Sequence, residues 1–132
     1  MSLPAPRPAR LEAVRFGRLA EMLCAMRLTL LGYRILARGY RVPVGEIDIV
    51  ARRRDTLVFV EVKARAVLED ALAAVAPRQR QRVMRAAEAY VATHPQLALL
   101  TTRFDVMIVL PWPHLRCLWP LHLRDAWRPG LA

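Results

Sequence analysis

The feature that most constrains the fold is a pair of neighbouring segments that both have the character of β-strands. They are "GEIDIVA" at residues 45–51 and "TLVFVEVKA" at residues 56–64, and both are rich in β-branched residues, which is typical of strands. The charged loop "RRRD" between them makes a β-hairpin the simplest connection. A hairpin with two apolar strands needs partners to be stable, so we expect it to belong to a larger, covered sheet.

A long helix is predicted before this hairpin. Residues 11–31 follow a helical pattern, and Gly32 stands where the helix is expected to end. Apolar residues recur along one face, at Leu19, Leu23, Met26 and Leu30. The opposite face is hardly more polar, so the helix is expected to be covered on several sides. Glu21 lies among these apolar residues and is therefore expected to be half-buried and in need of a partner.

The other segments predict elements of both kinds. Strands are predicted at residues 33–38 and 103–110, and an edge strand is predicted at residues 115–119. A helix is predicted to begin at Pro77, with an apolar stripe at Val83, Ala87, Tyr90 and Val91. A short closing helix is predicted at residues 121–127. The main elements follow the order α, β, β, β, α, β. This order predicts an α/β protein of the α+β type, with a mixed sheet flanked by helices.

Length and composition fit one domain. A chain of 132 residues, of which 55% are hydrophobic, is long enough to bury one core. Pro4, Pro6 and Pro8 disfavour a helix at the beginning of the chain. We therefore predict a flexible arm at residues 1–10 and a single domain at residues 11–132.

The chain is strongly basic, with a formal net charge of +10. This charge attracts phosphate polyanions or an acidic membrane surface, although abundant arginine can also reflect the coding bias of a genome. Cys24 and Cys117 are far apart and show no ligand or disulfide spacing, which favours a reduced, cytoplasmic compartment. The start of the chain lacks the pattern of a signal peptide, and the apolar run at residues 19–31 is interrupted by charges and too short for a membrane span. We expect no membrane association.

The hairpin brings charged side chains together. Alternation along its second strand places Glu61 and Lys63 on one face, and Asp48 on the first strand comes within one or two pairing positions of Glu61. Crowded carboxylates stay ionised only when a cation neutralises them, and their oxygens suit Mg²⁺. Lys63 is the single lysine among 21 basic residues, and an amine, unlike a guanidinium, can take part in proton transfer. The alternative is an ordinary exposed Glu–Lys surface pair, which is the commoner arrangement.

These residues resemble two known groups of proteins. Asp48, followed on the next strand by Glu61-Val62-Lys63, is similar to the metal-binding signature of the PD-(D/E)XK nuclease superfamily, which has the restriction-endonuclease-like fold. The stretch "GYRILARGYRVPVGEIDIVARRRDTLVFVEVKAR" at residues 32–65 resembles the YraN family, uncharacterised protein family 0102. The likeness covers roughly residues 16–110.

The resemblance implies a role for each matching residue. Asp48 and Glu61, helped by the backbone carbonyl of Val62, would hold Mg²⁺ or Mn²⁺, and Lys63 would position the attacking water. Glu21 matches the helix acid of the Holliday-junction-resolvase-like branch, and a cap or an ion pair is the alternative. Relatives in that branch act as dimers, so a homodimer is expected by analogy. The chain departs from the family in lacking a lysine near the start of its second helix.

Other polar residues are candidates for contacts with nucleic acid. They are Arg52, Arg53 and Arg54 in the hairpin loop and Arg78, Gln79, Arg82 and Arg85 on the second helix. A solvated face is the alternative for the arginines of that helix. Glu46 is expected to pair with an arginine. Asp105 is expected to pair with Arg103 or to cap a turn, and the three tryptophans are expected to close the core.

The leading hypothesis is a cytoplasmic, metal-dependent nuclease that binds nucleic acid, expected to be DNA, and hydrolyses phosphodiester bonds with a metal-activated water. The alternative is a nucleic-acid-binding module with a nuclease-like fold and no turnover. A peripheral membrane protein is disfavoured, because no amphipathic basic helix with a strong apolar face is evident.

Overall fold

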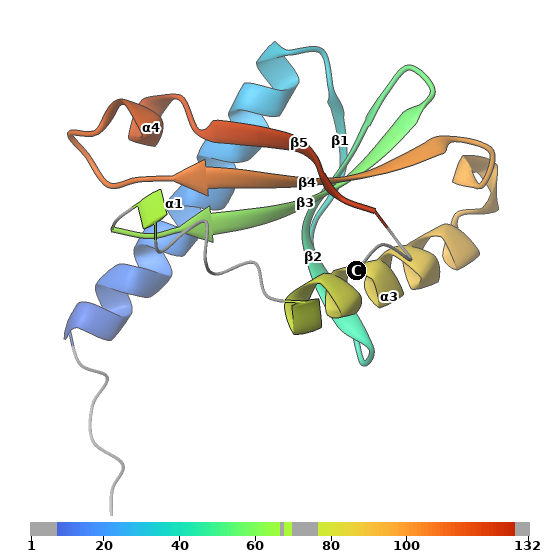
Figure 1. The fold of residues 1–132 in the computed structure, drawn as a ribbon, viewed down its shortest axis with the longest axis horizontal. Helices are drawn as coiled ribbons and strands as arrows, with labels where there is room; N and C mark the ends of the chain where they lie inside the picture. Colours follow the sequence, from blue (N-terminus) through green and yellow to red (C-terminus); the bar gives the residue numbers. More distant parts are fainter. Residues whose placement is uncertain (1–7, 67, 70–76, 129–132) are drawn as a thin grey trace, which may run out of the picture.

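Five strands form one mixed β-sheet in the computed structural model of the chain, which describes residues 8–66, 68–69 and 77–128 (Figure 1). The strands are β1 (Arg34–Val42), β2 (Gly45–Arg53), β3 (Thr56–Ala64), β4 (Thr101–Val109) and β5 (Leu121–Trp127). The helices are α1 (Pro8–Leu30), α3 (Pro77–Thr93), the 3-10 turn η1 (Pro95–Leu97) and α4 (Leu115–Leu118). The strands lie in the sheet in their order along the chain. The predicted α+β class, with a mixed sheet flanked by helices, is confirmed.

The predicted hairpin is present and lies inside the sheet. β2 and β3 are antiparallel, and their paired residues run from Arg53 opposite Thr56 to Ile49 opposite Val60. β1 pairs with β2, and β5 pairs with β4, both in antiparallel fashion. β3 and β4 are parallel, so the chain must cross one face of the sheet between them, and α3 lies in that connection.

α1 and α3 cover opposite faces of the sheet, as Figure 1 shows. On one face, Val58 and Val60 of β3 pack in a buried cluster with Leu28 of α1. On the other face, Phe59 packs in a second buried cluster with Tyr90 of α3. Adjacent residues of β3 therefore face different helices, which is the alternation expected of a strand buried on both sides.

The ends of α1 follow simple backbone chemistry. The helix begins at Pro8, earlier than predicted, because proline at the first turn lacks an N–H that would otherwise stay unbonded. Residues 1–7 of the predicted arm lie outside the described residues. Gly32 ends the helix as predicted: its φ is 89°, and the N–H of Tyr33 donates to the carbonyl of Leu28 over 2.9 Å.

The predicted apolar stripe of α1 is largely exposed, so the expectation that this helix is covered on several sides is wrong. Leu19 and Met26 are exposed, and Leu30 is 75% exposed. The buried face instead carries small residues such as Ala20 and Cys24, which allow the helix to lie close to the sheet. No helix in the described part of the chain has a stretch long and apolar enough to cross a membrane.

The last two predicted elements are of the wrong type. Residues 115–118 form the helix α4 where an edge strand was predicted, and residues 121–127 form β5 where a helix was predicted. Leu121 and Leu123 pack against the cluster on the α3 face, and His122 between them pairs with β4 as part of the sheet. This is the two-residue period of a strand, but seven residues are too few to separate that period from a helical one in the sequence.

The tryptophans divide between core and surface. Trp127 is buried and its ring stacks on Phe104 with centroids 5.3 Å apart, so it closes the core as predicted. Trp112 and Trp119 are exposed, and the same prediction is wrong for them. Both follow β4 at the end of the sheet where α4 lies, outside the two buried clusters.

A close contact between β2 and α3 sets the position of that helix. Gly45 begins β2 and is buried, and a Cβ atom added to it would lie 1.9 Å from the carbonyl oxygen of Arg82. Only glycine fits at this distance. The first half of α3, which carries Gln79, is therefore held against the start of β2.

Candidate active site

Glu61 and Lys63 lie side by side on the α3 face of β3. Their side chains are 6% and 11% exposed, and Nζ of Lys63 lies 3.1 Å from Oε1 of Glu61. The side-chain amide of Gln79 donates to the same oxygen over 3.2 Å. The predicted adjacency is confirmed, and the burial of both groups rules out an exposed surface pair.

Asp48 is positioned where the pairing of β2 with β3 ends. The last paired residues are Ile49 and Val60. Just beyond them the N–H of Val62 donates to Oδ2 of Asp48 over 2.8 Å, so a carboxylate takes the place of a backbone carbonyl. The hairpin thus brings Asp48 to the segment that holds Glu61, as expected if the hairpin formed, and the structure supplies the register that the sequence left open.

The pKa values of Asp48 and Glu61 are both raised, so both carboxyl groups are harder to ionise than in water. Burial raises the pKa of Asp48 to about 7, the negative charge of Glu61 adds to this effect, and the hydrogen bond from Val62 opposes it. Burial also raises the pKa of Glu61, although the ammonium of Lys63 opposes the shift. One cation beside a buried and a half-buried carboxyl group leaves negative charge that is not neutralised when both are ionised.

The donor atoms of this pair suit a divalent cation. Oε1 of Glu61 and Oδ2 of Asp48 each accept hydrogen bonds, whereas the second oxygen of each group accepts none from the described residues. Oxygen ligands and unneutralised negative charge are what Mg²⁺ or Mn²⁺ requires, and Mg²⁺ commonly uses only one or two protein carboxylates. Among residues 8–66, 68–69 and 77–128, no group of three or more His, Cys, Asp or Glu side chains is placed to hold a metal ion. The contribution of the Val62 carbonyl stays a prediction.

Glu21 lies on α1 near this pair and has a partner of its own. Its Oε1 accepts from Nε of Arg38 on β1 over 3.1 Å, so the ion-pair alternative is present. Its negative charge also contributes, after burial and Glu61, to the raised pKa of Asp48. A direct role for Glu21 in the acidic site remains a prediction.

Arg52 and Arg53, which were predicted in the hairpin loop, belong to β2, and only Arg54 lies in the turn; both strand arginines are engaged within the protein. Nε of Arg52 donates to the carbonyl of Arg54, and Nη1 of Arg53 donates to the carbonyl of Leu31. The loop precedes Thr56, and Glu61 lies roughly 16 Å further along the strand at the usual rise per residue. These arginines therefore lie at the opposite end of the β2–β3 hairpin from Asp48 and Glu61, which we call the acidic pair.

The polar residues of α3 lie closer to the acidic pair. Arg78, Arg82 and Arg85 are exposed, with Arg78 next to Gln79 in the first turn. Gln79 was predicted to contact phosphate, and the structure adds a bond to Glu61 that the sequence did not indicate. No spacing rule could have shown it, because it depends on how α3 packs on the sheet.

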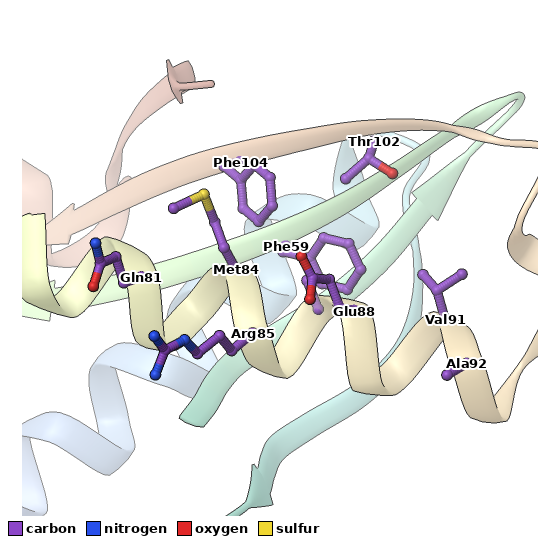
Figure 2. A pocket seen from close by; sticks show the side chains of 10 residues that line it. Phe59, Gln81, Met84, Arg85, Glu88, Val91, Ala92, Thr102 and Phe104 are labelled. Carbon is purple, nitrogen blue, oxygen red and sulfur yellow. The ribbon is translucent and has the colours of Figure 1, made fainter. Parts of the chain in front are cut away.

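A groove of about 770 Å³ lies between α3 and β4, on the same face of the sheet (Figure 2). Phe59 and Phe104 form an apolar wall, and Arg85 and Glu88 of α3 border it. The acidic pair does not line this groove. Of the predicted phosphate contacts, only Arg85 borders it.

A second buried polar cluster lies on the α1 face. Asp105 is fully buried and accepts from Arg103, as predicted, at 2.8 Å from both Nε and Nη2. Nε2 of His122 lies 2.6 Å from Oδ2 of the same carboxylate, and the N–H of Asp125 donates to Oδ1. The part played by His122 was not predicted. Separately, Glu46 pairs with Arg41, with 3.8 Å between charged atoms, as expected of it.

Comparison with known proteins gives a consistent family signal. The model of "Uncharacterised protein family UPF0102" matches residues 20–109. A UPF0102 protein of Rhodopseudomonas palustris strain BisA53 is 53% identical over 108 residues, which cover 82% of this chain and 83% of the relative. A UPF0102 protein of Bradyrhizobium diazoefficiens is 55% identical over 104 residues, covering 79% and 78%. A UPF0102 protein of Paramagnetospirillum magneticum is 46% identical over 132 residues, covering 97% and 98%.

Proposed function

The chain belongs to the uncharacterised protein family UPF0102, whose name states no activity, and from the geometry of the acidic pair we propose that it is a metal-dependent nuclease. The observation that carries the proposal is the arrangement of the half-buried Asp48 and the buried Glu61 and Lys63 at the end of the β2–β3 pairing. It combines two carboxylates with an amine. This set of groups, on a basic chain, suits the hydrolysis of a phosphodiester.

Each of the three residues has a distinct task in the proposed reaction. Asp48 and Glu61 would hold Mg²⁺ or Mn²⁺, since each has one carboxylate oxygen that accepts no hydrogen bond from the described residues. When bound, the ion supplies positive charge that offsets the carboxylates and polarises a phosphoryl oxygen. Lys63 orients the attacking water, exchanges a proton with it and stabilises negative charge that develops on the phosphate. Gln79 fixes the Glu61 carboxylate through its 3.2 Å hydrogen bond.

Nucleic acid is the proposed substrate because of charge. The net charge of +10 attracts a polyanion, and α3 presents Arg78, Arg82 and Arg85 to solvent near Gln79. The superfamily of PD-(D/E)XK nucleases is the proposed wider relationship. The alternative function is a nucleic-acid-binding module of the same fold without turnover, and it shares the basic surface.

The test is cleavage by the Lys63→Ala variant. Labelled DNA and RNA, as single strands, duplexes and four-way junctions, are incubated with wild type and variant in Mg²⁺ or Mn²⁺. We expect the wild type to cut at least one substrate and the variant to be slower by about 100-fold or more, since a positioned proton-transfer group contributes at least that much. Binding measured in a chelator should change by less than about threefold, since one buried amine makes few phosphate contacts.

A matched variant separates charge from chemistry. Lys63→Arg keeps a cation beside Glu61 but cannot exchange a proton near neutral pH, so it should bind and fold like wild type and still fail to cut. If wild type cuts none of these substrates with either metal, the nuclease proposal is wrong and the binding module stands. If Lys63→Ala cuts as fast as wild type, the assigned site is wrong.

A further inference from the structure

Among the arginines with no carboxylate partner in the described part of the chain are Arg27 on α1, Arg116 on α4, which contacts α1, and Arg124 on β5. The Nε and Nη1 atoms of Arg27 are buried and have no hydrogen-bond partner among the described residues. Its guanidinium carbon lies 4.6 Å from the centroid of the Trp119 ring, at the end of α4. The aromatic ring stabilises the cation in part but supplies no acceptor for its N–H groups.

The neighbours of Arg27 add positive charge. Burial lowers the pKa of Arg27, and the charges of Arg116 on α4 and Arg124 on β5 lower it further. None of the three makes an ion pair within the described part of the chain, whereas Arg38, Arg41, Arg103 and Arg128 all do. A half-buried guanidinium with unpaired N–H groups and cationic neighbours is unfavourable unless an anion joins it.

This cluster of three arginines is distinct from Glu61 and Lys63. Glu61 and Lys63 face α3, whereas Arg27 lies on α1, which covers the opposite face. Burial raises the pKa of the Cys24 thiol to about 12, and the charge of Asp48 adds to this shift while that of Arg27 opposes it. α4 follows the end of β4, which pairs with the strand segment that carries Lys63.

We propose that Arg27, Arg116 and Arg124 form a binding site for a tetrahedral oxyanion of the phosphate class. Guanidinium groups present planar pairs of N–H donors that match phosphate oxygens, and Trp119 holds the plane of Arg27 in place. The oxyanion has two sources: a phosphate in the backbone of a bound nucleic acid, or a free phosphate. The site does not depend on cleavage, so it stands or fails separately from the nuclease proposal.

The first test uses inorganic phosphate as the probe. Thermal unfolding is followed in phosphate and in chloride of equal ionic strength, and the dissociation constant is taken from the rise in unfolding temperature with phosphate concentration. Wild type should be stabilised by phosphate, and Arg27→Gln should bind it at least about tenfold more weakly, the loss expected of a charged hydrogen bond. Arg18→Gln is the matched control, because Arg18 is an exposed arginine of the same helix. It should bind as wild type does.

Arg116→Gln and Arg124→Gln test the site even if Arg27→Gln fails to fold, because neither Arg116 nor Arg124 is fully buried. Both should also weaken phosphate binding. The proposal is overturned if phosphate stabilises wild type no more than chloride does, or if all three variants bind phosphate as tightly as wild type.

The second test identifies the source of the oxyanion. Binding of a labelled 20-nucleotide DNA or RNA is measured in a chelator, at several salt concentrations, for wild type and the same variants. If a backbone phosphate occupies the site, Arg27→Gln should lower the slope of log K against log salt by about one, and Arg18→Gln should lower it less. Weaker phosphate binding with unchanged nucleic-acid binding would assign the site to free phosphate. If Arg18→Gln lowers the slope as much as Arg27→Gln does, the proposed site is wrong and the binding is a diffuse attraction between opposite charges.

Discussion

The carboxyl groups of Asp48 and Glu61 are both partly or fully removed from water, so their contributions to the unfolding free energy depend on pH. The folded pKa of Asp48 is about 7, above the value near 3.9 expected in the unfolded chain. A raised pKa means that the folded state binds the proton more tightly. The contribution to stability is therefore complete below about pH 4 and is lost as the pH rises through 7.

This gives a prediction for Asp48→Asn, which keeps an acceptor for the N–H of Val62 but cannot ionise. In a chelator, the unfolding free energy of wild type should fall between pH 5 and pH 8, by a few kcal/mol at most. The variant should show a smaller fall, with a remainder from Glu61. Denaturant unfolding at each pH measures this, and equal slopes in the two proteins would contradict the raised pKa of Asp48.

Mg²⁺ bound by Asp48 and Glu61 should oppose this fall in unfolding free energy with rising pH. The ion binds carboxylates rather than carboxylic acids, so it should stabilise wild type more at pH 8 than at pH 5. Asp48→Asn should lose most of that stabilisation. A Mg²⁺ effect of equal size in both proteins would place the ion elsewhere.

The sequence predicted the relative positions of Glu61, Lys63 and Asp48 better than it predicted the contacts that surrounding residues make with them. Alternation alone placed Glu61 beside Lys63, and the expected hairpin placed Asp48 within one or two positions of Glu61, although its exact register came only from the structure. The bond from Gln79 and the pairing of Glu21 with Arg38 join elements far apart in the chain. Such contacts depend on how the helices pack, which a local pattern does not contain.

At the scale of elements, Gly45 decides where α3 lies. Gly45→Ala would place a methyl group 1.9 Å from the backbone carbonyl oxygen of Arg82. Neither the methyl group nor this oxygen can move without moving the backbone. We expect a loss of about 1 to 3 kcal/mol in unfolding free energy as α3 moves. The hydrogen bond from Gln79 to Glu61 should lengthen too, so cleavage should fall more than nucleic-acid binding.

Gly17→Ala is the control for that prediction. Gly17 lies in α1, and nothing comes within 4 Å of an added Cβ there. Alanine is the better helix former, so the variant should be more stable by roughly 0.5 to 1 kcal/mol. Chemical denaturation of both variants is the measurement. If Gly45→Ala is as stable as wild type, the close contact is not required.

The elements differ in how far the sequence determined them. β2 and β3 were predicted well because long runs of β-branched residues have few alternatives. α4 and β5 were exchanged because segments of 4 and 7 residues carry too few periods to separate helix from strand. The buried face of α1 was missed because apolar residues occur on its exposed sides as well, so only the packed structure decides which side faces the sheet.

At the scale of the whole molecule, the Asp105 cluster ties three parts of the fold together. Arg103 donates to Asp105 and to the hydroxyl of Tyr33, which follows α1, while His122 belongs to β5. Burial alone would raise the pKa of Asp105, but hydrogen bonds from His122, Arg103 and the Asp125 backbone lower it below its usual value. Its contribution to stability is therefore present above about pH 4 and is lost as the pH falls further.

Asp105→Asn tests this. The substitution leaves Arg103 without its counter-charge, so unfolding free energy at pH 7 should fall by about 3 kcal/mol. The acid unfolding of the variant should also be less steep between pH 4 and pH 2 than that of wild type. Circular dichroism during acid titration gives both curves, and superimposable curves would argue against the lowered pKa.

The parallel pairing of β3 with β4 has a consequence for the order in which the protein folds. Thr56 pairs with Thr101 and Ala64 with Val109, so each pair closes a loop of about 45 residues, which costs entropy before any contact is gained. The β2–β3 hairpin closes through a short turn and is expected to form first. Ile49→Val in β2 should therefore slow refolding, whereas Ile108→Val in β4 should mainly accelerate unfolding, as stopped-flow measurements would reveal. The hairpin that carries Asp48 and Glu61 would then be the folding nucleus, formed before the rest of the molecule closes around it.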